Sequence, residues 1–115
     1  MSLTQQQAKE KIIVALDVPT RAEALDLVDR LTGEVGAFKI GMQLYNAEGP
    51  DIVREIQARG GKVFVDLKFH DIPNTVAEAT RVITRRRASI MTLHAAGGLK
   101  MLSAAAESAK EAAES

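Results

Sequence analysis

Residues 62–75 combine a strand pattern, a group of charged residues and a helix start, and read Lys62-Val63-Phe64-Val65-Asp66-Leu67-Lys68-Phe69-His70-Asp71-Ile72-Pro73-Asn74-Thr75. The stretch begins with the pattern of an apolar strand, has charged residues at the end of that strand, and continues with the start of a helix. Because side chains on a strand alternate between faces, Asp66 and Lys68 point to one side and Leu67 to the other. The two charges form either an ordinary surface ion pair on an edge strand or part of a functional site.

Strand patterns and helix patterns alternate along the whole chain. Strand patterns cover residues 12–16, 37–41 and 89–94, and another opens the stretch 62–75; a helical pattern follows each of them. Residues 1–10 are polar and form a short arm, whereas residues 11–115 form four β-α units. Regular alternation of this kind predicts an α/β fold with a parallel sheet and right-handed crossovers.

Capping residues and apolar spacing predict where the helices begin and which faces they bury. Thr20 with Glu23, and Thr75 with Glu78, have the spacing of a capping box, and Pro50 suits the first turn of a helix. Residues 45–49 are predicted to form a loop. The alanine-rich helix over residues 99–114 is expected to bury Leu99, Leu102 and Ala106.

Each predicted strand ends in polar side chains. These are Asp17, Lys39, the pair Asp66 and Lys68, and His94. In parallel α/β architectures ligands bind at the carboxyl ends of the strands, and in a barrel those ends surround one pocket. This regularity favours a functional site over a surface ion pair, although a lone histidine such as His94 is interpreted as a structural hydrogen-bonding residue.

Composition narrows the class of protein. Fifteen basic and fifteen acidic residues cancel, so no net charge favours a nucleic acid or an anionic membrane as partner. The arginines of residues 85–87 are interpreted as a solvated helix end. The absence of cysteine suits a reducing compartment, and the polar arm lacks the apolar core of a signal peptide. We therefore expect a cytoplasmic protein with no membrane partner.

Residues 66–75, Asp-Leu-Lys-Phe-His-Asp-Ile-Pro-Asn-Thr, resemble the signature of the orotidine 5'-phosphate decarboxylase family of the bacterial type. The segments 15–17, 38–41 and 94–98 match that family in the same order. The resemblance covers the N-terminal half of the family's chain, and it implies the first four β-α units of a (β/α)8 TIM barrel. Related sugar-phosphate decarboxylases and synthases share the aspartates and the lysine of residues 66–71, but Lys39 favours the pyrimidine enzyme.

The resemblance implies decarboxylation of orotidine monophosphate to uridine monophosphate by a homodimer that uses no metal or organic cofactor. The implied catalytic residues are Lys39, Asp66, Lys68 and Asp71. The implied substrate-binding residues are Asp17, Lys39, Ile72 and Thr75. Asp71 and Thr75 are expected to reach across the dimer interface into the partner's site.

Two departures from the family pattern lead to further expectations. Strands five to eight, which usually supply the phosphate-binding groups, lie outside the match, so we expect little turnover from this chain alone. The alternative is an inactive half-barrel scaffold that associates with itself. Arg86 and Arg87 stand where the family usually has an apolar residue and a glycine, so we expect strain or a changed turn at Arg87.

Overall fold

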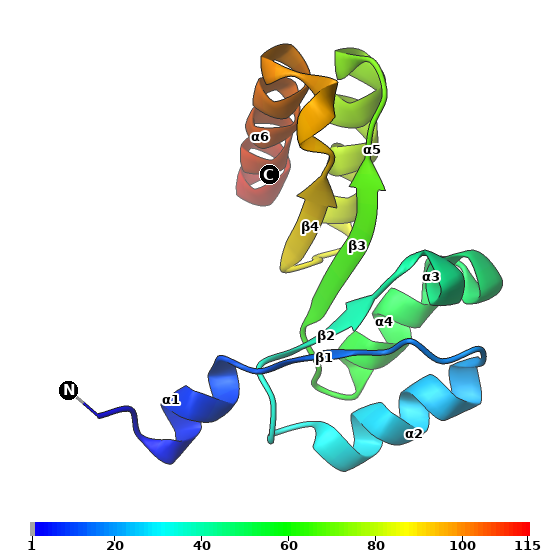
Figure 1. Ribbon diagram of the computed structural model, residues 1–115, viewed down its shortest axis with the longest axis vertical. Helices are drawn as coiled ribbons and strands as arrows, with labels where there is room; N and C mark the ends of the chain where they lie inside the picture. The colour runs from blue at the N-terminus through cyan, green and yellow to red at the C-terminus, as the bar shows by residue number, and fades with distance from the viewer. Residues whose placement is uncertain (1) are drawn as a thin grey trace. The chain divides into compact units, whose positions relative to one another are not determined.

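A computed structural model describes residues 2–115 and contains a four-stranded sheet in the order β1-β2-β3-β4 (Figure 1). The strands are β1 (Ile13–Ala15), β2 (Ala37–Ile40), β3 (Val63–Phe69) and β4 (Ile90–Leu93). The helices are α1 (Gln5–Glu10), α2 (Arg21–Leu31), α3 (Met42–Glu48), α4 (Asp51–Ala58), α5 (Pro73–Arg85) and α6 (Leu99–Glu114), with a 3-10 turn at Ala95–Gly97. The predicted alternation of strands and helices is confirmed.

The chain divides into two compact units, and the boundary falls within β3, after Phe64. In the first unit β1 and β2 pair in parallel, with Ala15 opposite Lys39. Helices α2 and α4 pack together, and the side chains of Phe38, Ile40 and Ile52 are buried. This core fixes the ends of β1 and β2, where two of the predicted site residues stand.

The apolar run at residues 12–16 is less covered than a strand buried on both faces. Ile13 is 44% exposed, and only Leu16 of this run is fully buried. The run forms a three-residue strand with one pairing partner, β2. A continuous apolar run predicts a strand here correctly but does not predict how much of its surface is covered.

In the second unit α5 and α6 lie side by side next to β3 and β4 (Figure 1). Val76 of α5 and Met101 and Ala105 of α6 form the centre of its core. Of the predicted stripe on α6, Leu102 is partly buried against this core, whereas Leu99 is 79% exposed and Ala106 is exposed. The buried positions are Met101, Ala105, Ser108 and Ala112, so the stripe is wrong at Leu99 and Ala106. Alanines occupy both faces of α6, so apolar spacing did not identify the face that packs.

One helix and the start of another also differ from the predictions. Residues 45–49, expected as a loop, belong largely to α3, which contains good helix formers but buries only Leu44 and so shows no apolar stripe. Helix α5 begins at Pro73, with Ile72 as its N-cap, instead of being capped by Thr75. A proline at the first helical position has no N–H to satisfy and has a φ suited to the helix.

Thr20 caps α2 as predicted, because its side chain accepts a hydrogen bond from the Glu23 N–H. The expected strain at Arg87 is confirmed by its φ of 65°, in the left-handed region. Within residues 2–115, no helix is both long enough and apolar enough to cross a membrane.

Candidate active site

The pairing of β1 with β2 in the first unit sets the positions of Asp17 and Lys39. Lys39 lies opposite Ala15, and its carbonyl accepts the Leu16 N–H at 2.9 Å. Lys39 is half-buried and Asp17 is exposed. A Cβ placed on Gly41 would lie 3.8 Å from Asp17 Oδ1, so this carboxylate stands beside the residue that follows β2. The parallel register thus brings the two predicted strand-end residues to one edge of the first unit.

Asp66 and Lys68 form an ion pair on β3 in the second unit. The Lys68 ammonium donates to Asp66 Oδ1 at 3.0 Å. Asp66 is only 8% exposed, whereas Lys68 is exposed. Removing a carboxylate from water is costly unless it is paired and hydrogen-bonded. The arrangement therefore differs from an ordinary surface ion pair, in which both partners remain solvated.

Thr92 on β4 contacts both members of this pair, and it was missed by the sequence reasoning. Its hydroxyl donates to Asp66 Oδ1 at 2.7 Å and accepts the backbone N–H of Lys68 at 3.0 Å. One signal could have identified it: Thr92 precedes His94 by two residues, so both belong to the same face of the predicted strand.

Lys68 has a φ of 52°, in the left-handed region that residues with a Cβ rarely occupy. The strand thus changes its backbone geometry at the residue that carries the ammonium group. Such conformations cluster at functional sites, where surrounding contacts hold them. Here the contact is the hydrogen bond from the Lys68 N–H to Thr92.

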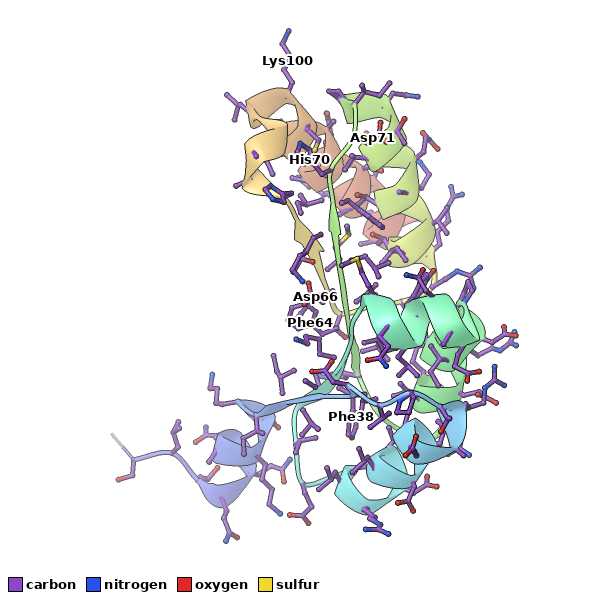
Figure 2. The ribbon with its side chains drawn as sticks, turned by 45° about the vertical axis from the view of Figure 1, so that its right-hand side comes forward. Phe38, Phe64, Asp66, His70, Asp71 and Lys100 are labelled. Carbon is purple, nitrogen blue, oxygen red and sulfur yellow. The ribbon has the colours of Figure 1, made fainter. Side chains whose placement is uncertain are left out.

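Asp71, Ile72 and Thr75 lie where β3 leads into α5. The Asp71 carboxylate accepts the Ile72 N–H at 2.7 Å, and all three residues are exposed. His70, Asp71, Ile72 and Pro73 line a shallow depression together with Gly97. Figure 2 shows His70 and Asp71 beyond Asp66, towards the carboxyl end of β3. Asp71 therefore belongs to the same strand end as the ion pair but is turned to the start of α5.

Two histidine rings stack beside this depression. The rings of His70 and His94 have centroids 4.8 Å apart and planes inclined by 21°. His94 Nδ1 also accepts a hydrogen bond from the Ala96 N–H at 3.2 Å. The bond agrees with the interpretation of His94 as a structural residue, because it caps the 3-10 turn that leads into α6.

A model of the family described as "Orotidine 5'-phosphate decarboxylase / HUMPS family" matches residues 10–114. This chain belongs to that family. A relative named orotidine 5'-phosphate decarboxylase from Syntrophomonas wolfei is 57% identical over 108 residues, which are 94% of this chain and 45% of the relative. The enzyme of that name from Moorella thermoacetica is 52% identical over 96% of this chain and 44% of its own length.

Solved structures of orotidine 5'-phosphate decarboxylases are also similar to this chain. The orotidine 5'-phosphate decarboxylase of Lactobacillus acidophilus has a TM-score of 0.79 at 33% identity and matches 89% of this chain and 46% of its own. The orotidine 5'-monophosphate decarboxylase of Methanocaldococcus jannaschii, complexed with the inhibitor BMP, has a TM-score of 0.80 at 30% identity over 87% of this chain and 47% of its own.

These matches confirm the predicted family and the predicted fold class. The strand order β1-β2-β3-β4 is that of the first four units of a (β/α)8 barrel. The chain spans about 45% of the length of the curated orotidine 5'-phosphate decarboxylases that it matches.

Proposed function

We propose that this chain carries the N-terminal catalytic residues of an orotidine 5'-phosphate decarboxylase, which converts orotidine monophosphate to uridine monophosphate and carbon dioxide. The observation that carries the proposal is the Asp66–Lys68 pair, in which a nearly buried carboxylate holds an exposed ammonium at 3.0 Å. The relatives of that name, at 57% and 52% identity, support the choice of substrate.

The chemistry requires a fixed positive charge beside one carbon atom. When the bond between C6 and the carboxylate breaks, carbon dioxide leaves and the electron pair stays on C6, where the pyrimidine ring offers no electron sink. The Lys68 ammonium would stabilise this carbanion and then transfer a proton to C6. Asp66 would stand against the substrate carboxylate and favour its departure. The step consumes one proton and needs no oxidant, reductant or metal ion.

The other predicted site residues take supporting roles in this proposal. Lys39 and Asp17 would bind the ribose, since both stand at the β1 and β2 edge of the first unit. Lys39 is also a proposed catalytic residue, together with Asp71. Ile72 and Thr75 would contact substrate near the start of α5.

We also propose that the enzyme is a cytoplasmic homodimer in which Asp71 and Thr75 serve the partner's site. Ile72 lies between these two residues in the sequence and is 65% exposed, so its side chain is accessible to a partner. The absence of cysteine suits the reducing cytoplasm.

The activity is tested by the loss of ultraviolet absorbance of orotidine monophosphate. The chain is assayed alone, and again when joined through Ser115 to the part of the Syntrophomonas wolfei relative that it does not match. We expect turnover from the joined protein and little or none from the chain alone, because binding energy from remote substrate groups organises the reacting centre. A folded joined protein that leaves the absorbance unchanged would refute the proposal and support the scaffold alternative.

The proposed dimer is tested by size-exclusion chromatography with light scattering on the joined protein. We expect the mass of two copies, and we expect Ile72→Asp to shift the protein towards one copy because it buries a charge in an apolar contact. Ile12→Asp is the control, since Ile12 is also an exposed isoleucine but lies in the first unit. A single copy at micromolar concentration for the unaltered protein would contradict the proposal.

A further inference from the structure

Thr92 places one hydroxyl group between the two charged residues of β3. It donates to Asp66 Oδ1 at 2.7 Å and accepts the Lys68 N–H at 3.0 Å. We propose that Thr92 is a positioning residue, which sets the Lys68 ammonium relative to Asp66 for proton transfer. The inference rests on the decarboxylase function proposed above, but its structural part can be tested without turnover.

The direction of both hydrogen bonds follows from the chemistry of the groups. A backbone N–H can only donate, so the hydroxyl oxygen must accept from Lys68. An ionised carboxylate can only accept, so the hydroxyl proton must point to Asp66. Thr92 therefore has a single orientation that satisfies both neighbours. A valine at this position has no polar side-chain atom and cannot make either bond.

The contact matters because the Lys68 backbone is held in an unfavourable conformation. Its φ of 52° brings the Cβ too close to the following carbonyl, and a lysine has no intrinsic preference for this region. The hydrogen bond from the Lys68 N–H to Thr92 opposes relaxation to an ordinary strand geometry. Such a relaxation would change the direction of the Lys68 Cα–Cβ bond and so move the ammonium group.

Asp66 is constrained by the same hydroxyl. Its Oδ1 accepts from Thr92 and from the Lys68 ammonium, and only 8% of the residue is exposed. Loss of the Thr92 hydroxyl group leaves the nearly buried Asp66 carboxylate with one protein donor fewer. This loss favours a reorientation of the Asp66 side chain. Thr92 thus fixes one partner by its backbone and the other by its carboxylate.

The kinetic test compares Thr92→Val with Thr92→Ser in the joined protein. Valine keeps the shape and removes the hydroxyl, whereas serine keeps the hydroxyl. We expect Thr92→Val to lower kcat by about 100-fold, the effect of displacing a reacting group by roughly 1 Å. KM should change by less than about threefold, because the contacts that bind the rest of the substrate are untouched. Thr92→Ser should restore kcat to within about threefold of the unaltered protein.

The structural test follows the Lys68 backbone amide by ¹⁵N NMR in this chain. We expect Thr92→Val to shift this amide signal and speed its exchange with solvent, and we expect Thr92→Ser to leave both nearly unchanged. The amide of Lys100, an exposed lysine on α6, is the internal control. If the valine variant does not fold, Thr92→Ala removes the same hydroxyl with less bulk and is measured in its place.

The outcomes separate this inference from the proposed function. Equal kcat values for Thr92→Val and the unaltered joined protein would overturn the positioning role, and so would equal losses in Thr92→Val and Thr92→Ser. If the joined protein has no activity, the proposed function fails and the NMR measurement decides alone. If Thr92→Val changes neither the Lys68 amide signal nor its exchange with solvent, the inference is then overturned.

Discussion

Replacing Arg87 by glycine should stabilise this chain. Helix α5 ends in a Schellman motif, in which the Ala88 N–H donates to the Ile83 carbonyl at 3.4 Å and the Arg87 N–H donates to the Thr84 carbonyl at 2.9 Å. Arg87 occupies the left-handed position of this motif, with a φ of 65°. Glycine is the usual residue there because it has no Cβ to clash with the backbone.

The expected gain follows from two opposing contributions. A residue with a Cβ loses about 1–2 kcal/mol in the left-handed region. Glycine removes this strain but has more conformational freedom in the unfolded chain, which costs about 0.5–1 kcal/mol. The net effect of Arg87→Gly is then a rise of about 0.5–1 kcal/mol in the free energy of unfolding. With a urea m-value of about 1–2 kcal/mol/M, the unfolding midpoint should rise by roughly 0.5 M.

The assay is urea unfolding of this chain followed by circular dichroism. Arg87→Ala is the matched control, because it removes the guanidinium group and its contacts but keeps the Cβ and the strain. We expect the glycine variant to be more stable than the alanine variant, with equal m-values. If the two variants unfold at the same urea concentration, the left-handed conformation at this position does not affect stability and the prediction is wrong.

Three further changes test the packing of each unit by the same unfolding assay. Thr80 is buried and its hydroxyl has no hydrogen-bond partner among the described residues, so Thr80→Val should raise the free energy of unfolding by about 1 kcal/mol; an equal or lower value would contradict this. Ser108 donates to the Ala77 carbonyl at 2.6 Å, so Ser108→Ala should lower the free energy of unfolding by about 1 kcal/mol, and an unchanged midpoint would refute the contribution of that bond. A Cβ on Gly36 would overlap the Glu10 carbonyl oxygen, so Gly36→Ala should lower the free energy of unfolding by about 2 kcal/mol, and an unchanged midpoint would contradict this.

The alternation of strands and helices could be predicted because apolar spacing records it directly. The run of Val63 and Val65 before Asp66 predicts a buried strand with a charged end, and β3 has that form. Helix α3 was missed because it buries one side chain and so leaves no periodic signal. Helix α6 was placed correctly, but alanines on both of its faces concealed the face that packs.

The candidate site was predicted more completely than its supporting contacts. The alternation of side chains along β3 was enough to pair Asp66 with Lys68. The role of Thr92 depends on the left-handed backbone of Lys68, and no local sequence rule predicts that conformation for a lysine. The left-handed backbone of Arg87 could be expected, because the family pattern has a glycine at that position.

In the proposed mechanism, Lys68 supplies the charge and the proton for decarboxylation. This role is tested most directly by comparing Lys68→Ala with Lys100→Ala in the joined protein, since both changes remove one exposed lysine from the second unit. We expect Lys68→Ala to abolish the loss of absorbance of orotidine monophosphate and Lys100→Ala to retain it. Equal rates for the two variants would show that Lys68 does not supply the charge and the proton.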